Sequence, residues 1–415
     1  MRSLIFHDWE TENRRSSVTK PLSYFGLCDS NGPDLPHCCV FVALVEDSSY
    51  NCPIMQMSFC RLRTHQWCFL LFNVLLFHAL LFGADFVEEY LLQPAPRTYM
   101  DAKVLEIREQ ARKLDMNAVR ANDTHWYVIS NPRVCTDQDV FLLTLVFSTP
   151  ENSSRRENIR GTWANRTHVQ GFLVQTLFLL GSSHSPTTQA AIMVESKHYA
   201  DIIQGWFIDS HKNLISKTVL AMQWAVTYCP FARFILITDE SAFINILALG
   251  EYLLTLRRHP EDLYMGRVVH QDMPDRDPRS TRYVSPNQYS HKYFPDYCAG
   301  LAFVVSQDVA RKVYVASSGV VAPVPYDVFV GLCAQRAGVV PTHSFRFSGE
   351  RHIHYNICCY RFLFSSADVG TSELPLIWND LQSKGNCSML VTYYGLVKCK
   401  VLTYLDKLSF SNARP

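Results

Sequence analysis

Net charge of either sign is nearly absent from this chain of 415 residues, because 39 Lys and Arg residues stand against 38 Asp and Glu residues, for a formal charge of +1. Such a balance provides no overall field to attract a polyanion, so nucleic acid is not expected as a partner. The sequence also lacks the CxxC pairs and His spacings of zinc sites. From Cys135 onward it shows no internal repeat and no flexible linker, which predicts a single domain.

One long apolar run stands out in the N-terminal part, at residues 67–87. Its length is sufficient to span a bilayer. Arginines precede the run and acidic residues follow it, so the positive-inside rule places the N-terminus in the cytoplasm and the rest of the chain in a lumen. A cleaved signal peptide is an alternative, although Phe82 stands where a small residue should precede the cut. A buried helix of a soluble protein is the second alternative. We predict a type II signal anchor.

The run divides the chain into segments of different composition. Residues 1–66 mix Ser, Pro, Asn and scattered Cys without periodicity, which predicts a largely disordered cytoplasmic tail. Residues 88–134 contain a charged helical piece with little apolar face, which predicts a stem that acts as a spacer. Residues 135–415 form the expected luminal domain. Four sequons follow the run and are expected to carry N-glycans: Asn122, Asn152, Asn165 and Asn386.

Strands and helices alternate through the first part of this domain. Short apolar runs predict buried strands at 139–147, 172–180, 234–237, 264–269 and 301–305, and helical periodicity or basic helix starts predict helices at 155–163, 187–199, 213–228, 246–256 and 326–337. This alternation predicts an α/β fold, in which ligands bind at the carboxyl ends of the strands. Asp239 and Glu240 directly follow the third strand and mark a candidate site. An ordinary acidic turn is the alternative.

A series of motifs points to a family. The motifs include Arg156-x-x-Ile-Arg160-x-Thr-Trp163, Phe207-x-Asp-Ser-x-x-Asn-Leu-x-x-Lys-Thr218, Tyr293-x-Pro-x-Tyr-Cys-x-Gly300, Asp327-Val-Phe-Val-Gly331 and Cys359-Tyr-Arg361. On these motifs the chain resembles the β-1,3-galactosyltransferase family, which includes β-1,3-N-acetylglucosaminyl- and N-acetylgalactosaminyltransferases. The resemblance extends over residues 139–381.

The resemblance implies a fold, a location and an activity. The implied fold is a GT-A type, nucleotide-sugar-binding (Rossmann-like) luminal domain behind a single transmembrane helix of a Golgi membrane protein. The implied activity is inverting transfer of galactose or an N-acetylhexosamine from a UDP-sugar, such as UDP-galactose, to the 3-hydroxyl of a glycan acceptor. Homo-oligomers, or hetero-oligomers with other glycosyltransferases, are also compatible with it. The alternative is a catalytically inactive member that binds glycans or a partner glycosyltransferase.

The resemblance also assigns roles to residues of this chain. Asp327 matches the general base that accepts the acceptor hydroxyl's proton. Donor binding is expected from a set of charged residues: Arg156, Arg160, Lys217, Asp239 and Glu240.

The metal site of the family departs from its pattern in this sequence. The family holds Mn²⁺ with an Asp in the strand-end motif and a His near the C-terminus, and Ser241 and Ala367 stand at those positions here. A hydroxyl and a methyl group do not replace a carboxylate and an imidazole as metal ligands. Tight Mn²⁺ binding is therefore not expected, although the family requires it. Without a metal, Asp239 and Glu240 facing a diphosphate would repel it.

A disulfide is expected between Cys135 and Cys229. Each lies at the N-terminal side of a predicted core strand, and the expected lumen is oxidising.

Overall fold

The computed structural model describes residues 64–91, 101–121, 126–165, 167–256, 260–280, 282–320, 323–383 and 387–411. Nearly all of the predicted cytoplasmic tail lies outside these residues, as do the sequons at Asn122 and Asn386.

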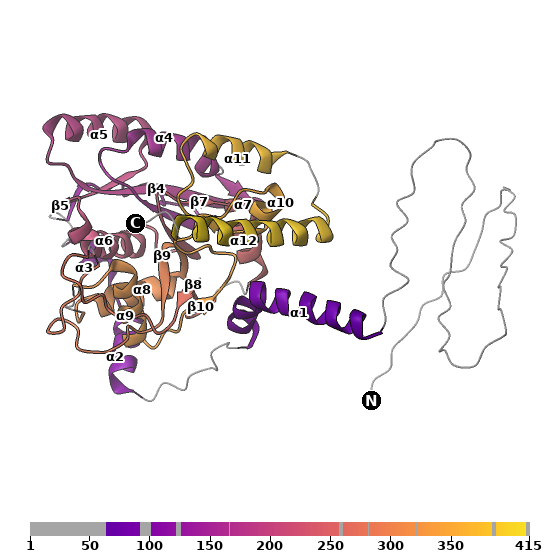
Figure 1. The fold of residues 1–415 in the computed structure, drawn as a ribbon. Coiled ribbons are helices and arrows are strands. Elements are labelled where there is room, and N and C mark those ends of the chain that lie inside the picture. The colour runs from indigo at the N-terminus through magenta and orange to yellow at the C-terminus, as the bar shows by residue number, and fades with distance from the viewer. Residues whose placement is uncertain are drawn as a thin grey trace, which may run out of the picture. The chain divides into compact units, whose positions relative to one another are not determined.

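A mixed sheet forms the centre of the domain (Figure 1). In the described part of the chain its strands follow the spatial order β1 (Tyr127–Ile129), β5 (Ile202–Ile208), β4 (Phe172–Ser182), β2 (Val140–Phe147), β6 (Phe234–Asp239), β9 (Tyr297–Ser306), β8 (Tyr264–Val269) and β10 (Thr342–His343), and β3 (His168–Val169) pairs with β4. Strands β5, β4, β2 and β6 are parallel, whereas β9 runs antiparallel to β6 and β8. The carboxyl ends of the parallel strands therefore meet at one edge.

Helices cover both faces of the sheet, as expected for strands that are apolar on both sides. Their bounds are α4 (Ser153–Gly161), α5 (Pro186–Tyr199), α6 (Leu214–Tyr228), α7 (Ile246–Thr255), α8 (Gln307–Ser317), α9 (Tyr326–Arg336), α10 (Ile357–Phe362), α11 (Glu373–Gln382) and α12 (Met389–Ser411), with short 3-10 helices at Trp163–Asn165 and His211–Asn213. Along β2, Leu143 and Leu145 face a core shared with α6, α8 and α9, while Leu142 and Val146 face a core shared with α4, α5, α7 and α11. This two-sided packing confirms the predicted α/β class.

Several elements were not predicted from the sequence, namely β5, α8, α10, α11 and α12. Strand β5 shows why, because the polar Gln204 lies in its middle and interrupts the apolar pattern. In the structure Gln204 is fully buried and its amide donates to the Gly181 carbonyl at 2.9 Å. A distant partner thus satisfies a polar side chain that local periodicity counts against a strand.

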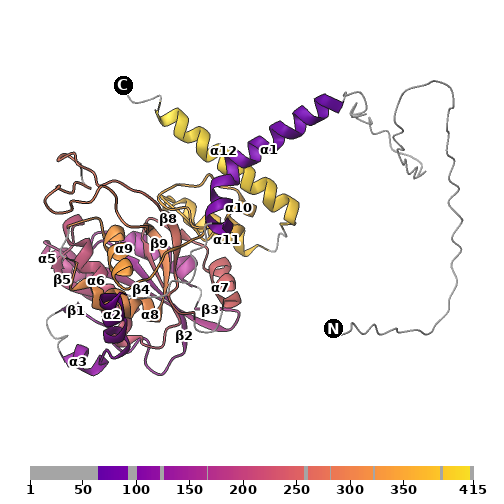
Figure 2. The same cartoon turned by 90° about the horizontal axis from the view of Figure 1, so that it is seen from below.

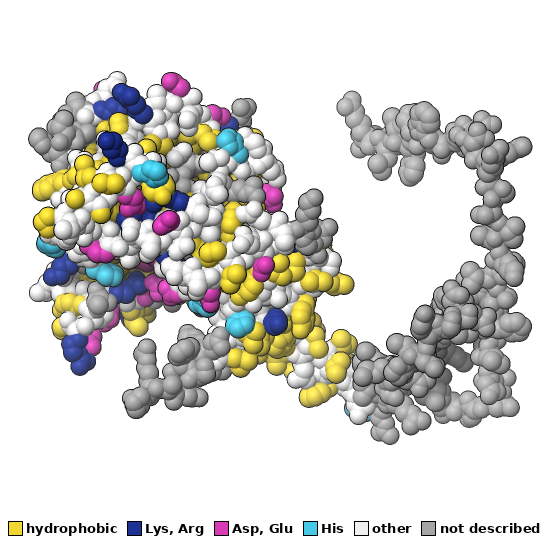
Figure 3. All heavy atoms as spheres, turned by 90° about the horizontal axis from the view of Figure 1, so that it is seen from above, with side chains coloured by type: hydrophobic (Ala, Val, Ile, Leu, Met, Phe, Trp, Pro, Cys, Tyr) yellow, Lys and Arg dark blue, Asp and Glu magenta, His cyan; other side chains and the backbone are white. Residues whose placement is uncertain are grey.

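The N-terminal helix α1 (Thr64–Phe86) continues into a π-helical turn, η1 (Val87–Leu91). Within the described ranges one helix, at His65–Leu91, is long and apolar enough to cross a membrane, and it contains the predicted span. Hydrophobic side chains cover the outside of α1 (Figure 3). The membrane topology stays a prediction.

The predicted stem differs from a simple spacer, because it packs against the domain. It contains α2 (Ala102–Arg112) and α3 (Met116–Ala121). The guanidinium of Arg108 donates to both carboxylate oxygens of Asp262, at 3.0 and 2.8 Å, and to the Ala337 carbonyl at 3.2 Å. Ala111 is buried beside it. Helix α2 therefore docks through a forked ion pair together with the packing of Ile107 and Ala111.

This docking predicts a difference between two arginines of α2. Arg108→Ala should lower the free energy of unfolding by about 1–2 kcal/mol, because it leaves the Ala337 carbonyl and half-buried Asp262 with fewer donors. The matched control is Arg112→Ala, whose exposed guanidinium pairs only locally with Glu109 in the contacts observed and should change stability by less than about 0.5 kcal/mol. Denaturant unfolding of residues 101–415 measures both. Equal effects would contradict docking through Arg108.

Candidate active site

The carboxyl end of β6 forms a tight turn that begins the site. Asp239 ends the strand, and its Oδ1 accepts the backbone N–H of Ser241 at 2.7 Å. The chain continues into β7 (Phe243–Ile244), which pairs antiparallel with β11 (Ser365–Ser366). Beyond this pairing, the N–H of Val369 donates to the Ser241 carbonyl at 3.3 Å. The fold thus brings positions 241 and 367 together, although 126 positions separate them in the sequence numbering.

One cavity opens beside this turn, and a second cavity adjoins the first. The first has a volume of about 760 Å³ and the second about 1000 Å³. The residues of the first cavity used below are Lys212, Asp239, Ser241, Arg282, Asp327, Ala367 and Asp368. Among the described residues, four line both cavities: Arg282, Pro325, Asp327 and Glu350. Asp327 therefore stands where the two cavities meet.

Asp327 lies in the first turn of α9 and is 3% exposed. Its carboxylate accepts the backbone N–H of Val328 at 2.9 Å and that of Gly300 at 3.3 Å. Burial raises the pKa of this carboxyl group, and the guanidinium of Arg282, 3.7 Å away, opposes the rise. A buried carboxylate with a raised pKa is a stronger proton acceptor than an ordinary aspartate, as a general base requires.

Tyr326, which precedes Asp327, holds the neighbouring strand. Its hydroxyl donates to the carbonyl of Gly300, and a Cβ atom at Gly300 would lie 2.5 Å from that hydroxyl oxygen. Glycine at position 300 is therefore required for the close approach. Tyr326 also lines the first cavity and gives this part of its wall an uncharged side chain.

Glu240 points away from the first cavity. Its carboxylate accepts the Ser148 hydroxyl and the Asn152 side-chain amide, the latter at 2.5 Å, and the side chain is almost completely buried. It links the end of β2 to the start of α4. Asp239 is the member of the acidic pair that lines the cavity.

Arg155 fixes the same turn from the other side. Its guanidinium donates to the carbonyls of Glu240, Ser241 and Val369 at 2.7, 3.0 and 2.6 Å. Burial lowers its pKa, and the carboxylates of Glu240, Asp239 and Asp368 oppose the decrease. Arg155 therefore holds the backbone that carries the two positions of the family's metal ligands.

The three cations expected to bind the donor lie in ion pairs behind the cavity. Arg156 is fully buried and forms a bidentate pair with Glu195 at 2.8 and 2.7 Å. Arg160 pairs with Glu195 and Asp201.

Lys217 is likewise buried, and its ammonium group donates to Asp209 at 2.7 Å and to the Ser148 carbonyl at 3.0 Å. None of these three cations lines the first cavity. Lys212 and Arg282 do line it, and neither was proposed from the sequence. Both lie outside the long helices and strands, so no helical or strand periodicity in the sequence indicated them as site residues.

The residues around the turn do not fit a tightly held divalent metal. Ser241 offers a neutral hydroxyl, and Ala367 offers no ligand atom. Among the residues that the structure describes, one group of three His, Cys, Asp or Glu side chains brings its ligand atoms within 4.8 Å of one another, namely Asp85, Glu88 and His343. None of these lines the first cavity.

Comparison with known proteins identifies the family. A family model described as galactosyltransferase matches residues 154–344. The chain is 53% identical over 352 residues to "Beta-1,3-galactosyltransferase 9" of Homo sapiens, a match that covers 85% of this chain and 95% of the relative. The chain belongs to the galactosyltransferase family.

Two further relatives show the breadth of the family. "Lactosylceramide 1,3-N-acetyl-beta-D-glucosaminyltransferase" of Homo sapiens is 36% identical over 312 residues, covering 73% of this chain and 82% of the relative. "Beta-1,3-galactosyltransferase 1" of Mus musculus is 34% identical over 260 residues, covering 62% and 79%. The chain is therefore an enzyme of the glycosyltransferase class, with a mixed α/β glycosyltransferase fold.

The position of Asp327 predicts separate effects on activity and stability. Asp327→Asn should reduce sugar transfer by at least about 100-fold, because the amide cannot accept the proton. It should leave the melting temperature unchanged or raise it at pH 7. A carboxyl group whose pKa is higher in the folded state than in the unfolded state lowers the stability of the fold when it is ionised. This loss of stability disappears at pH values below the pKa of the group in the unfolded state.

Transfer assays and thermal melts of the same samples measure both quantities. Transfer by the unmodified chain should also decline on acidification at a pH above the usual pKa of an aspartate. Loss of activity together with a lower melting temperature would indicate a structural role for Asp327.

Proposed function

We propose that this chain is an inverting β-1,3-glycosyltransferase that moves galactose, or an N-acetylhexosamine, from a UDP-sugar to a glycan acceptor. The observation that carries the proposal is the position of Asp327 at the junction of the two cavities. One cavity would hold the donor and the other the acceptor, so a single carboxylate would face the reacting hydroxyl. The names of the relatives are consistent with this reaction.

The reaction assigns one step to each part of the site. The acceptor hydroxyl, entering from the second cavity, transfers its proton to the carboxylate of Asp327. Its oxygen then bonds to the first carbon of the donor sugar as the bond from that carbon to the diphosphate breaks, and UDP leaves. Attack on the face opposite the leaving group inverts the configuration.

Positively charged side chains of the protein would stabilise the departing diphosphate. Of the Lys and Arg residues that the structure describes, Lys212 and Arg282 line the first cavity. Glu240 is turned into the loop at Ser148, whereas Asp239 and Asp368 line this cavity, so these cations would also have to offset negative charge on its wall. Positive groups aimed at developing charge in a cavity that excludes water lower the barrier to reaction. We therefore propose a site with little or no dependence on Mn²⁺.

The cellular setting belongs to the same proposal. We infer a GT-A type domain on the luminal side of a Golgi membrane, behind the anchor at 67–87. The apolar helix and the two disulfides, Cys135–Cys229 and Cys358–Cys387, support an oxidising lumen. Asn165 is exposed and available to carry a glycan, whereas the amide nitrogen of Asn152 donates to Glu240. A glycan on Asn152 would attach to the atom that forms this contact.

A donor panel tests the proposal. The domain from residue 101 onward is incubated with UDP-galactose, UDP-N-acetylglucosamine or UDP-N-acetylgalactosamine and a set of β-linked glycan acceptors, with Mn²⁺ or with a chelator. We expect transfer from one UDP-sugar to a 3-hydroxyl, with at most a few-fold stimulation by Mn²⁺. Lys212→Ala should reduce transfer about tenfold or more by removing a positive charge from the diphosphate.

The matched control for that variant is Lys197→Ala, which removes an exposed lysine of α5 and should leave transfer unchanged. Absence of transfer from every UDP-sugar, with UDP still bound, would favour the non-catalytic, glycan-binding alternative. Equal effects of the two lysine variants would reject the role of Lys212.

A further inference from the structure

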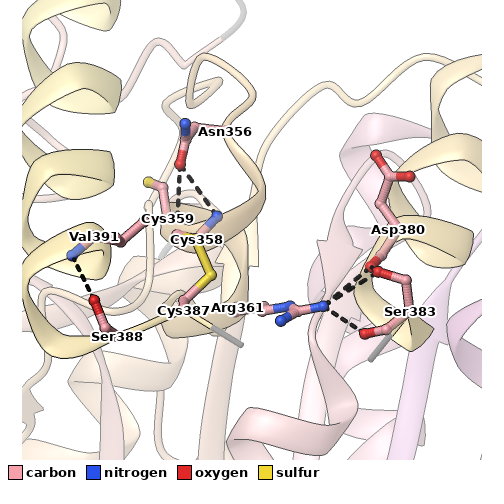
Figure 4. Close-up of a disulfide and its surroundings, with 9 residues drawn as sticks. All are labelled: Asn356, Cys358, Cys359, Arg361, Asp380, Ser383, Cys387, Ser388 and Val391. Atoms are coloured by element: carbon pink, nitrogen blue, oxygen red, sulfur yellow. Dashed lines mark hydrogen bonds between the residues drawn. A yellow bond between two sulfur atoms is a disulfide. The ribbon is translucent and has the colours of Figure 1, made fainter. Parts of the chain in front are cut away.

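Helix α10 carries two adjacent cysteines, Cys358 and Cys359, at its start. Cys358 is joined to Cys387 by a disulfide that the sequence did not predict, with the two Cα atoms 5.7 Å apart (Figure 4). The side-chain oxygen of Asn356 accepts the backbone N–H groups of both cysteines, at 3.1 and 3.2 Å. This cap fixes the two cysteines at the end of the helix. The thiol of Cys359 is free in the structure.

Helix α12 packs directly on this end of α10, and Gly395 makes the close approach possible. A Cβ atom at Gly395 would lie 2.6 Å from the Asn356 side-chain oxygen and 3.2 Å from the Cys359 backbone nitrogen. Cys399 follows four residues later, on the same face of α12. Figure 2 shows α10 and α12 next to one another.

Cys359 and Cys399 meet in this contact. Their exposed fractions are 1% and 0%, and both belong to one apolar core. Two buried cysteines on the facing sides of packed helices are candidates for a disulfide. Two other cysteine pairs of the chain, Cys135–Cys229 and Cys358–Cys387, are disulfide-bonded in the structure.

We propose that Cys359 and Cys399 form a third disulfide, which joins α10 covalently to α12. Two S–H bonds break and one S–S bond forms, and two protons and two electrons leave the pair. The electrons pass to the disulfide of a protein oxidant by thiol–disulfide exchange, which reduces that disulfide to two thiols. This disulfide does not depend on whether the domain transfers sugar.

The surroundings of the pair determine when the bond can form. The neighbouring thiol of Cys399 and burial both raise the pKa of the Cys359 thiol. Because the thiolate is the reactive species, oxidation of the folded and buried pair is slow. The bond therefore closes during folding, before α12 covers α10. A chain folded under reducing conditions retains both thiols.

Peptide mapping tests this pairing in the full chain, made in a eukaryotic secretory pathway. The chain is denatured in the presence of a thiol-alkylating reagent, which blocks free thiols. It is then freed of N-glycans and digested with trypsin without reduction. Cleavage at Lys and Arg places the cysteines of this region on three peptides: 352–361, 385–398 and 399–400. We expect all three in one disulfide-linked species that separates on reduction. Cys298 and Cys333, which are also buried and free, should be alkylated and serve as internal controls.

Two outcomes of the mapping would overturn the proposal. One is a linked pair of peptides 352–361 and 385–398 with Cys359 and Cys399 both alkylated. The other is a three-peptide species in which Cys359 is bonded to Cys387. To separate this second outcome from the expected one, Cys399→Ser is mapped in parallel, and fragmentation of peptide 352–361 should then locate the new alkyl group on Cys359.

Stability gives an independent readout. Cys359→Ala and Cys399→Ala should each lower the melting temperature, and the double variant should be no less stable than the less stable single variant, because either change removes the whole bond. Cys333→Ala is the control for loss of a buried sulfur atom and should have a smaller effect. Additive losses from Cys359→Ala and Cys399→Ala would show two independent thiols and contradict the bond.

Discussion

The buried carboxylate of Glu240 is the contact on which the arrangement of the site depends. It accepts hydrogen bonds from Ser148, at the end of β2, and from Asn152, at the start of α4. Arg155 returns from α4 to the carbonyls of Glu240, Ser241 and Val369. The strand end, the first turn of a helix and the segment after β11 are thereby held as one unit. A buried network of this kind is rigid when every member has a partner, so it can present Asp239 to the first cavity.

This arrangement changes the electrostatics that the sequence suggests. Two adjacent carboxylates at the donor diphosphate would repel it strongly without a metal. In the structure one of them serves the scaffold, and Lys212 and Arg282 line the cavity with Asp239. The fold therefore removes one of the two expected carboxylates from the cavity, while Asp368 and Glu350 remain on its wall with Asp239. Ser241 and Ala367 are compatible with such a site, since neither adds a charge to it.

The sequence predicted best where local pattern and tertiary packing agree. Continuous apolar runs identified β2, β4 and β6, and helical periodicity identified α6, because these elements are buried by neighbours on both sides. Strand β5 was not predicted, because the polar Gln204 interrupts its apolar pattern and is satisfied by a distant contact with Gly181. Helix α12 was not predicted, because its apolar residues do not form one clear stripe and several of them are exposed.

For the candidate site, the motifs predicted the residue types but not the direction of each side chain. Arg156 and Arg160 lie at the expected junction of strand and helix, yet Glu195 and Asp201 bind them away from the cavity. Such partners lie far along the chain, and no local rule identifies them.

The most direct test of the account is calorimetric titration of UDP into the domain from residue 101 onward, once with a chelator and once with Mn²⁺, beside the double variant Ser241→Asp with Ala367→His. The account predicts that the unmodified domain binds UDP with similar affinity in both buffers, and that the double variant gains affinity with Mn²⁺. Binding of UDP by the unmodified domain that disappears in the chelator would contradict it.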